Sequence, residues 1–325
     1  MTITASDISV VICAYTDERW PDLVAAIASV KEQRTPPREI IVVIDHNPAL
    51  LERVRAEVAA VVAIENGGAR GLGGSRNSGI AVAQGAVIAF LDDDATATPD
   101  WLEQLSTGYV NPNVVGVGGA ILPYWLGRRP TWWPEEFNWV IGCDYRGLPQ
   151  TTASVRNMVG ANMSMRREVF DTVGKFRLGK VDTTSQPEET ELCIRTLQKI
   201  PNGIWLYEPR ARVLHTVPVA RTSRRYFLTR CYNEGLGKAA MVNLVGAGDG
   251  LSAERSYMFK TIPSGVLQGL RDAIVRRDLT GLGRSAAIVT GLIVTTVSYV
   301  YGRVMLSLNR RRRTNSAVNL SGEQV

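Results

Sequence analysis

Short apolar runs rich in β-branched residues alternate with helix-like segments through the first 120 residues. The first two runs, Ile8–Ala14 and Glu39–Asp45, are almost continuously apolar, which is typical of strands buried on both faces of a sheet. Strands separated by helices of this length specify a parallel sheet with right-handed crossovers. We therefore predict an α/β fold with a mostly parallel sheet flanked by helices. Its strands would cover 8–14, 39–45, 61–64, 86–91 and 114–122, and its helices 20–33, a stretch from 48, 75–84 and 99–109.

The pattern changes between residues 123 and 150. Four tryptophans lie here among prolines and glycines, without a clear period. The segment is either an irregular surface excursion packed by its own aromatic rings, or a wall for a second substrate, because loops on a rigid sheet often carry specificity. A more regular block follows, and from about residue 222 the chain is predicted to be mostly helical. In that block we expect strands over 157–165 and 203–215 and helices over 167–173 and 188–197.

The C-terminal region contains an uncharged segment, Ser285–Gly302, between Arg284 and Arg303. Its length is at the lower limit for a membrane span, and serine, threonine and glycine dilute its hydrophobicity. Three interpretations are open: a transmembrane helix, a helix in the membrane interface with the arginines of 310–313 on acidic headgroups, or an ordinary packed helix. The formal net charge of +6 agrees with an anionic membrane surface as a partner. Since no nucleic-acid recognition motif accompanies the arginines, we expect no nucleic-acid partner.

The four cysteines stand far apart, without a CxxC or a zinc-binding spacing. The N-terminus lacks the basic and apolar regions of a signal peptide. Both features favour a reducing compartment. We therefore expect a cytoplasmic protein, located at the inner face of the cell membrane if the C-terminal helix meets lipid.

Three aspartates, Asp92, Asp93 and Asp94, directly follow the apolar run that ends at Leu91. Clustered carboxylates at the end of a buried strand are costly unless a cation shares their charge. Mg²⁺ and Mn²⁺ favour one or two protein carboxylates together with the oxygens of a substrate diphosphate. Ligands of open α/β sheets lie just beyond the strand ends, which is where this triplet would be. The alternative is a solvated acidic turn that caps the next helix.

Three further features end successive strands at the same edge: Ala14-Tyr15-Thr16-Asp17, Asp45, and the glycine-rich stretch 67–79. That stretch does not fit the dinucleotide fingerprint, which follows the first strand and would require glycine where Arg76 stands. It is not a P-loop either. What remains is a loop at a helix N-terminus with Arg70 and Arg76, suited to a diphosphate, or a turn with solvated arginines.

The order of these features resembles the family 2 glycosyltransferases, which have the Rossmann-like GT-A fold and use nucleotide-diphospho-sugars, and in particular their bacterial members. The resemblance covers roughly residues 8 to 235. It rests on the segments VVICAYTDE, IIVVID, GGSRNSGI, FLDDD, VGANMSMRREVFDTVGKF, PEETELCIR and RYFLTRCYNEGLGKA. It implies a catalytic domain over 1–220 with a nucleotide-binding half (1–120) and an acceptor-binding half (121–220), followed by a helical region with a basic tail (221–325).

The resemblance also implies roles for individual residues. The nucleotide would meet Ala14, Tyr15, Asp17, Asp45, Gly73, Arg76, Asn77, Asp92 and Asp93. Mg²⁺ or Mn²⁺ would be held by Asp94, Asp92 and His215. The acceptor side would include Gly160, Ala161, Asn162, Trp132 and Trp133. Strand alternation would turn Asp93 away from the metal as a spacer.

The catalytic carboxylate departs from the family pattern. The usual Glu-Asp pair is Glu188-Glu189 here, so a glutamate stands at the position of the base. Glu189 is the expected base and Glu188 the next candidate, whereas Glu191 would face another side of the helix. The alternative is an acidic first turn that the helix dipole favours.

These resemblances imply an inverting, metal-dependent hexosyltransferase. It would move a sugar from a UDP- or dTDP-linked donor to a hydroxyl of a glycan or lipid-linked acceptor, in the synthesis of cell-envelope polysaccharide or glycolipid. A sugar nucleotidyltransferase is the nearest rival, but it would usually carry a glycine-rich basic loop directly after strand one, where ICAYTDERW has no glycine. A non-catalytic, membrane-tethered nucleotide-binding protein would have lost aspartates or late carboxylates, and both are present.

Overall fold

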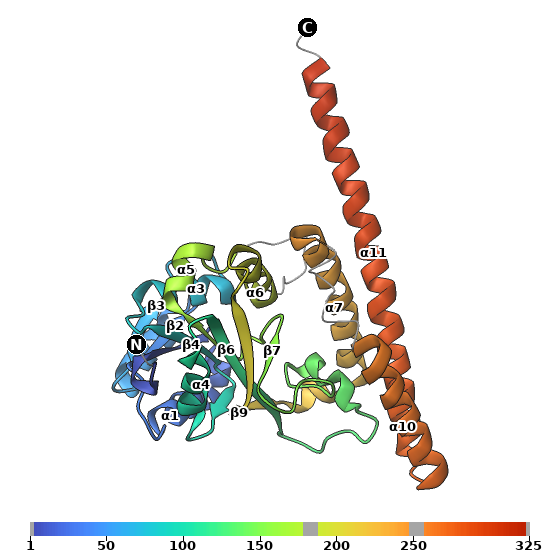
Figure 1. Cartoon of the computed structure of the whole chain (residues 1–325), viewed down its shortest axis with the longest axis horizontal. Coiled ribbons are helices and arrows are strands. Elements are labelled where there is room, and N and C mark those ends of the chain that lie inside the picture. Colours follow the sequence, from blue (N-terminus) through green and yellow to red (C-terminus); the bar gives the residue numbers. More distant parts are fainter. Residues whose placement is uncertain (1–2, 178–187, 247–256, 323–325) are drawn as a thin grey trace. The chain divides into compact units, whose positions relative to one another are not determined.

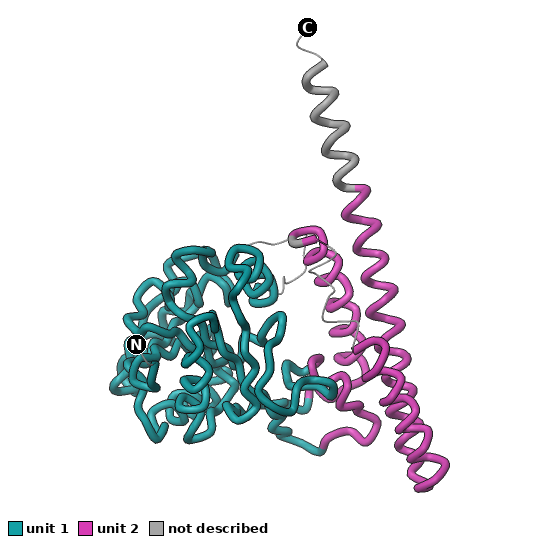
Figure 2. Tube along the Cα trace, in the orientation of Figure 1, with its two compact units in different colours: residues 1–128, 141–178, 188–219 teal, residues 129–140, 179–187, 220–325 magenta. Residues whose placement is uncertain are grey.

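The computed structural model describes residues 3–177, 188–246 and 257–322 and divides into two compact units (Figures 1 and 2). The first unit comprises Met1–Arg128, Ile141–Leu178 and Glu188–Val219 and contains the sheet. The second contains Arg129–Val140 and the chain from Ala220 onward, and it is helical. The division into a nucleotide-binding and an acceptor-binding half stays a prediction.

The first unit is built on one nine-stranded sheet with the order β3-β2-β1-β4-β8-β6-β9-β5, in which β7 also pairs with β9. Its first four strands are parallel, as predicted. They are β1 (Ile8–Ala14), β2 (Glu39–Ile44), β3 (Val62–Glu65) and β4 (Val87–Asp92). The helices α1 (Trp20–Lys31), α2 (Pro48–Glu57) and α3 (Leu72–Val82) connect them. Buried β-branched strands between helices of this length thus produce the expected α/β half.

The other half of the sheet is mixed. β8 (Asn162–Arg166) lies between β4 and β6 (Val114–Trp125) and runs antiparallel to both. β6 is parallel to β9 (Ile204–Val217), whereas β5 (Ala95–Ala97) and β7 (Ala153–Val155) pair antiparallel with β9. The α/β architecture is confirmed, but parallel pairing does not extend through it. A strand that enters from an irregular segment needs no crossover helix when it pairs antiparallel.

Two differences from the predicted elements concern the residues near the site. The strand expected over 157–165 starts only at Asn162, and β7 was not predicted. α3 begins at Leu72 rather than Ser75, so Gly73 and Gly74 lie in its first turn. A Cβ at Gly74 would come within 1.9 Å of the Ala69 carbonyl oxygen. Gly74 therefore permits a close approach between the start of the helix and the preceding loop, which a search for apolar periodicity does not detect.

The remaining helices of the first unit are α4 (Trp101–Thr107), α5 (Arg167–Val173) and α6 (Glu188–Lys199). α3 packs closely on the sheet, because a Cβ at Gly79 would lie 2.5 Å from Val11. On α5 and α6, Phe170 and Leu192 share one core cluster with Phe90 of β4. This cluster fixes α3 and α6 beside the end of β4, where the acidic triplet lies.

The second unit consists of α7 (Arg224–Val245), the π-helical turn Tyr257–Thr261, α10 (Ile262–Val275) and α11 (Thr280–Gly322), which agrees with the predicted helical region. Rings from the tryptophan-rich segment pack around Phe227 of α7, with centroids 5.3 to 5.6 Å apart. They belong to Trp132, Trp133 and Phe137. The segment is therefore not packed by its own aromatics alone. By length and composition, Thr280–Leu308 of α11 could cross a membrane.

Candidate active site

Two members of the acidic triplet form a cluster with a histidine at the end of β4. Asp92 is the last residue of β4, and the pairing of Ala95 with His215 brings the histidine of β9 beside Asp94. The Nε2 atom of His215 lies 3.2 Å from an Asp94 carboxylate oxygen. One ligand atom from each of Asp92, Asp94 and His215 lies within 4.8 Å of the others. Two carboxylates and an imidazole suit Mn²⁺ or Mg²⁺, so the side chains expected to hold the metal fit one.

Arg19 contacts this cluster, although the sequence did not single it out. It ends the short helical turn Asp17–Arg19 after β1, and its Nη1 lies 3.1 Å from Asp93 and 3.3 Å from Asp94. Burial raises the pKa of Asp93 to about 7, against the effect of Arg19 and with the help of the two neighbouring aspartates. Asp93 is thus buried and bonded to Arg19. Its Oδ2 is without a hydrogen-bond partner among the described residues, and its expected contact with a nucleotide stays a prediction.

Arg76 connects the acidic cluster to α6. Its side chain is almost fully buried, with Nη2 3.4 Å from Asp92 and Nη1 3.7 Å from Glu189. The guanidinium lies 5.4 Å from the ring centroid of Phe176 and 5.8 Å from that of Phe90. A Cβ at Gly160 would lie 2.3 Å from Nη2, so a side chain there would require the end of Arg76 to shift. The structure therefore places Arg76, Asp92, Glu189 and Gly160 together.

The two candidate bases begin α6. The side chain of Glu189 is partly exposed, whereas Glu188 lies against the first turn of α3. A Cβ at Gly73 would come within 2.3 Å of the Glu188 carboxylate. Burial raises the pKa of Glu188, and Arg76 opposes that rise. Arg76 therefore acts on both carboxylates, and the assignment of Glu189 as the base stays a prediction.

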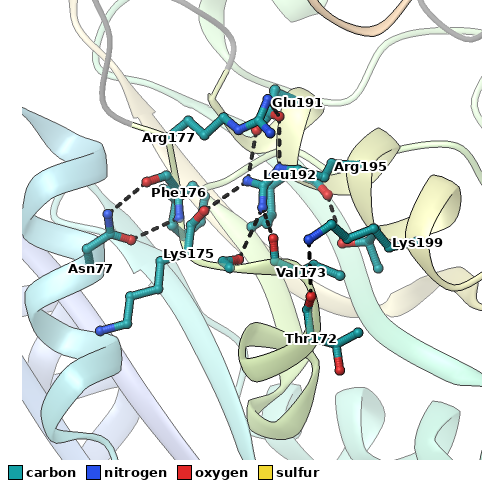
Figure 3. Close-up of polar contacts among 12 residues, drawn as sticks. Asn77, Thr172, Val173, Lys175, Phe176, Arg177, Glu191, Leu192, Arg195 and Lys199 are labelled. Atoms are coloured by element: carbon teal, nitrogen blue, oxygen red, sulfur yellow. Dashed lines mark hydrogen bonds and ion pairs between the residues drawn. The ribbon is translucent and has the colours of Figure 1, made fainter.

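A buried ionic network holds α6 in place (Figure 3). Glu191 accepts two bonds of 2.9 Å from Arg195, one turn further along α6, and pairs with Arg177 at 3.0 Å. Arg195 also donates to the backbone carbonyls of Val173, Gly174 and Lys175 at the end of α5. Glu191 thus has other partners than Glu189, and it fixes the helix that carries the candidate bases.

Asn77 joins α3 to the same region. Its side chain exchanges two bonds with the backbone of Phe176, at 2.8 and 2.9 Å (Figure 3). The amide is therefore engaged in fixing the chain after α5. Its expected contact with a nucleotide stays a prediction.

Asp45 fastens the glycine-rich loop. Its carboxylate accepts bonds from Asn66 (2.7 Å), from His46 (2.8 Å) and from the backbone N–H of Gly71 (2.9 Å). Burial alone would raise the pKa of Asp45, but these bonds hold it below its usual value. The Asn66 side chain also accepts a bond from the backbone N–H of Gly68 and donates one to the carbonyl of Ala69. It therefore connects Asp45 to the backbone of the loop. The sequence contained no signal for Asn66, because a lone asparagine after a strand is common in turns.

The other expected nucleotide-binding residues surround the end of β1. Ala14 is its last residue and is buried, and the ring of Tyr15 is exposed with Arg19 over it at 5.7 Å. Asp17 lies 3.7 Å from Arg53 of α2. An exposed aromatic ring beside an arginine is a suitable surface for a nucleobase, and the role of these three residues stays a prediction.

The expected acceptor-side residues belong to two different units. Gly160, Ala161 and Asn162 lie at the start of β8 in the first unit, with Gly160 against Arg76. Trp132 and Trp133 belong to the aromatic cluster of the second unit, where Trp133 is fully buried. Their contact with an acceptor stays a prediction.

Asn162 is a buried structural link. Its amide accepts a 2.8 Å bond from the indole of Trp101 and donates to the carbonyls of Ala120 and Ala211. We expect Asn162→Leu to destabilise the first unit by at least about 3 kcal/mol, because three buried groups lose their partners. Urea unfolding followed by tryptophan fluorescence measures this. Asn113→Leu, at an exposed asparagine, should cost less than about 0.5 kcal/mol. A stable Asn162→Leu protein with poor acceptor binding would instead support the acceptor-side role.

A second buried acid lies next to the segment that contacts His215. The hydroxyl of Tyr207 donates to Asp144, and the neighbouring Cys143 Sγ is 3.9 Å from Nδ1 of His215. Burial raises the pKa of Asp144 from 3.8 to about 6. The folded state therefore binds a proton that the unfolded state releases, so the contribution of Asp144 to stability falls as the pH rises from about 4 through about 6.

We expect this loss to amount to at most about 3 kcal/mol. Comparing unfolding of the wild type and of Asp144→Asn across this pH range measures it, and the variant should show the flatter profile. Parallel profiles would show that Asp144 titrates normally.

Comparisons with known proteins agree with this geometry. Residues 9–174 match the model of the family described as glycosyl transferase family 2. The chain is 34% identical over 95% of its length to a glucosyl-dolichyl phosphate glucuronosyltransferase of Haloferax volcanii, 99% of which is covered. These matches do not confirm the bacterial type.

Two solved structures share the fold. A mannosyltransferase from Pyrobaculum calidifontis in complex with GDP-Man and Mn²⁺ matches with a TM-score of 0.56 and 15% identity, over 94% of this chain and 88% of the other. GalNAc-T7 with UDP, GalNAc and Mn²⁺ matches with a TM-score of 0.51 and 16% identity, over 82% and 57%. The GT-A fold of the chain is thereby established.

Proposed function

This chain belongs to glycosyltransferase family 2, and from that premise we propose that it transfers a sugar from a UDP- or dTDP-linked donor to an acceptor hydroxyl with inversion. One observation supports this most strongly: the buried Arg76 lies between Asp92 of the acidic cluster and Glu189 of α6. The leaving diphosphate gains negative charge, whereas the attacking hydroxyl loses a proton, and both events take place at neighbouring positions. The first needs cations, and the second needs a carboxylate base.

The donor side is formed by the end of β4 and the start of α3. Asp92, Asp94 and His215 would hold Mn²⁺ or Mg²⁺, whose charge, when it is bound, offsets the negative charge on the departing diphosphate. Arg19 keeps Asp93 and Asp94 in place, and Arg76 places a fixed positive charge beside Asp92. The two arginines are already partly desolvated, so little reorganisation precedes the reaction.

The acceptor side centres on Glu189. Its carboxylate takes the proton of the acceptor hydroxyl while that oxygen attacks the anomeric carbon, and the bond to the diphosphate breaks on the opposite face. A single base and direct displacement produce inversion, and no protein nucleophile is required. Since Glu189 is one methylene longer than the family's usual aspartate, the hydroxyl can lie further from α6.

We further propose a lipid-linked glycan as the acceptor and the cytoplasmic face of the cell membrane as the location. The name of the Haloferax relative specifies a glucosyl-dolichyl phosphate acceptor and a glucuronosyl donor group. The apolar helix α11 agrees with access to such a substrate. A glucuronosyl group is therefore one candidate among the sugars of UDP- and dTDP-linked donors.

A donor panel offered to the purified protein and a membrane extract tests the proposal, with products identified by mass spectrometry. The panel contains UDP-glucuronate, UDP-glucose, UDP-galactose, dTDP-rhamnose and GDP-mannose, each with Mn²⁺, Mg²⁺ or a chelator. We expect a glycosylated lipid and a free nucleoside diphosphate in the presence of metal only. Release of pyrophosphate would identify a nucleotidyltransferase, and nucleotide binding without any product would identify a non-catalytic protein.

A further inference from the structure

One face of α11 is exposed and carries no charge. The fully described stretch 285–302 has eight exposed positions, which recur every three or four residues along one side of the helix. They are Ala286, Val289, Thr290, Ile293, Thr296, Val297, Val300 and Tyr301, and we call them the α11 stripe. More than half of the surface of Ile293, Val297, Val300 and Tyr301 is accessible. A helix whose eight exposed positions faced water would be expected to carry charged residues there. We therefore expect lipid or another protein surface to cover the α11 stripe.

The opposite face of α11 is tightly packed within the second unit. A Cβ at Gly235 of α7 would lie 2.0 Å from the Ser298 hydroxyl, and one at Gly302 would lie 2.8 Å from Ala239. Thr295 donates a 3.2 Å bond to the carbonyl of Cys231. Nearer the start of α11, a Cβ at Gly291 would lie 2.6 Å from the ring of Phe137. The stretch 285–302 is therefore covered by protein along one side.

The helix that covers it could not enter a bilayer. α7 exposes Arg225 and Arg230 on its outer surface and carries an ion pair between Lys238 and Glu234, 3.2 Å apart. These charges belong to the same helix whose Cys231, Gly235 and Ala239 contact α11. If α11 spanned a membrane in this packing, α7 would be drawn into hydrocarbon with several charges, each of which costs several kcal/mol there. The packed α11 is thus suited to the surface of a membrane and not to its interior.

Basic residues mark both ends of the stripe. The turn between α10 and α11 exposes Arg276 and Arg277 together with Ile274, Val275 and Leu279, whose exposed fractions are 69 to 78%. Arg303 is exposed directly after the stripe, and the sequence adds four arginines at 310–313. Apolar side chains bordered by arginines match the boundary between acyl chains and anionic headgroups. This charge complementarity favours lipid over a second copy of the same basic surface.

We infer that α11 lies in the plane of an anionic membrane, with the α11 stripe buried in the headgroup region, and does not cross the bilayer. The inference deepens the membrane location in the proposed function and is independent of the transfer chemistry. Of the three possibilities for Ser285–Gly302, a transmembrane helix, an interfacial helix and an ordinary packed helix, the packing and the charges favour the interfacial helix. Through its packed face, α11 is part of the folded second unit. Through the α11 stripe on its other face, it gives that unit a lipid-binding surface.

Flotation of the purified full-length protein with vesicles tests the binding surface. We expect the protein to float with vesicles of phosphatidylcholine and phosphatidylglycerol and much less with phosphatidylcholine alone. Ile293→Glu/Val297→Glu should reduce the bound fraction by more than about tenfold. The matched control, Thr229→Glu/Asn233→Glu, places two glutamates at the same spacing on the exposed face of α7 and should float like the wild type. Equal flotation of both variants would overturn the inference.

Thiol labelling in sealed, inside-out membrane vesicles from expressing cells separates a surface helix from a span. Cysteines are introduced one at a time, in a variant without the four native cysteines, at Ser264 of α10 and at Ser307 beyond the stripe, which are both exposed positions. We expect a membrane-impermeant reagent to label both from the cytoplasmic side. Protection of Ser307→Cys alone would show that α11 crosses the bilayer and would overturn the inference.

Two controls separate the remaining explanations. Gel filtration of the wild type and of Ile293→Glu/Val297→Glu should show the same size, whereas a dimer lost in the variant, without flotation of the wild type, would make a second copy the occupant. Binding of UDP with Mn²⁺ in solution should be equal in both. Its absence from both would contradict the proposed function and leave the membrane result intact.

Discussion

Glu189→Gln should lower the rate of glycosyl transfer by about 100- to 10,000-fold while the protein still binds its nucleotide. The amide keeps the size of the side chain but cannot accept a proton from the acceptor hydroxyl. The side chain remains beside Arg76, whose other carboxylate neighbour, Asp92, is unchanged. Transfer is measured by product mass spectrometry and nucleotide binding by calorimetry, so that a loss of chemistry is distinguished from a loss of folding.

Two further variants sharpen this result. Glu188→Gln reports on the rival carboxylate, and the variant with the larger loss in rate identifies the base. Glu189→Asp restores the family's usual residue, and it should keep more activity than Glu189→Gln because it still accepts a proton. Normal turnover by Glu189→Gln would refute the assignment of the base.

Asp94→Asn should weaken binding of Mn²⁺ by at least about 100-fold, because even partners outside the ligand shell of a metal contribute 10- to 100-fold. Asp94 is the member of the cluster that contacts both His215 and Arg19. In the wild type, UDP with Mn²⁺ at about 100 times its Kd should stabilise the fold by about 2.7 kcal/mol. In the variant we expect no metal-dependent stabilisation, as measured by thermal unfolding with and without a chelator.

Asp22→Asn is the matched control for this experiment. The charge of Asp22 acts on the same cluster, since Asp94 contributes to the raised pKa of Asp22. The substitution therefore removes a neighbouring negative charge without removing a candidate ligand, and the Mn²⁺-dependent stabilisation should persist. If Asp94→Asn were stabilised as strongly as the wild type, the metal would have to bind elsewhere.

The parallel half of the fold could be predicted because its strands are buried on both faces. Such strands are continuous apolar runs, and the helices between them are long enough to be recognised. β8 and β7 were harder to place, since short antiparallel strands next to irregular segments leave no crossover helix as a sign. The glycines at the start of α3 are predicted as a loop, because glycines add nothing to an apolar period. Their contacts, with Ala69 and Glu188, become visible only in the structure.

The candidate site shows the same limit. Asp92, Asp94 and His215 could be proposed as ligands from residue type and order, and the structure brings them together. Arg19 and Asn66 were missed, because each acts through partners on other strands or loops. Asn162 was placed on the acceptor side, where an amide is a plausible ligand, yet its hydrogen bonds connect three backbone segments and an indole. The order of residues along the sequence indicates which groups meet, but not which of them already have hydrogen-bond partners within the protein.

The contact between Arg76 and Gly160 makes the position of the guanidinium sensitive to a single substitution. A Cβ at position 160 would lie 2.3 Å from Nη2, so in Gly160→Ala the end of the arginine side chain would have to shift. That guanidinium lies 3.4 Å from Asp92 and 3.7 Å from Glu189, so such a shift would alter the link between the donor side and the candidate base.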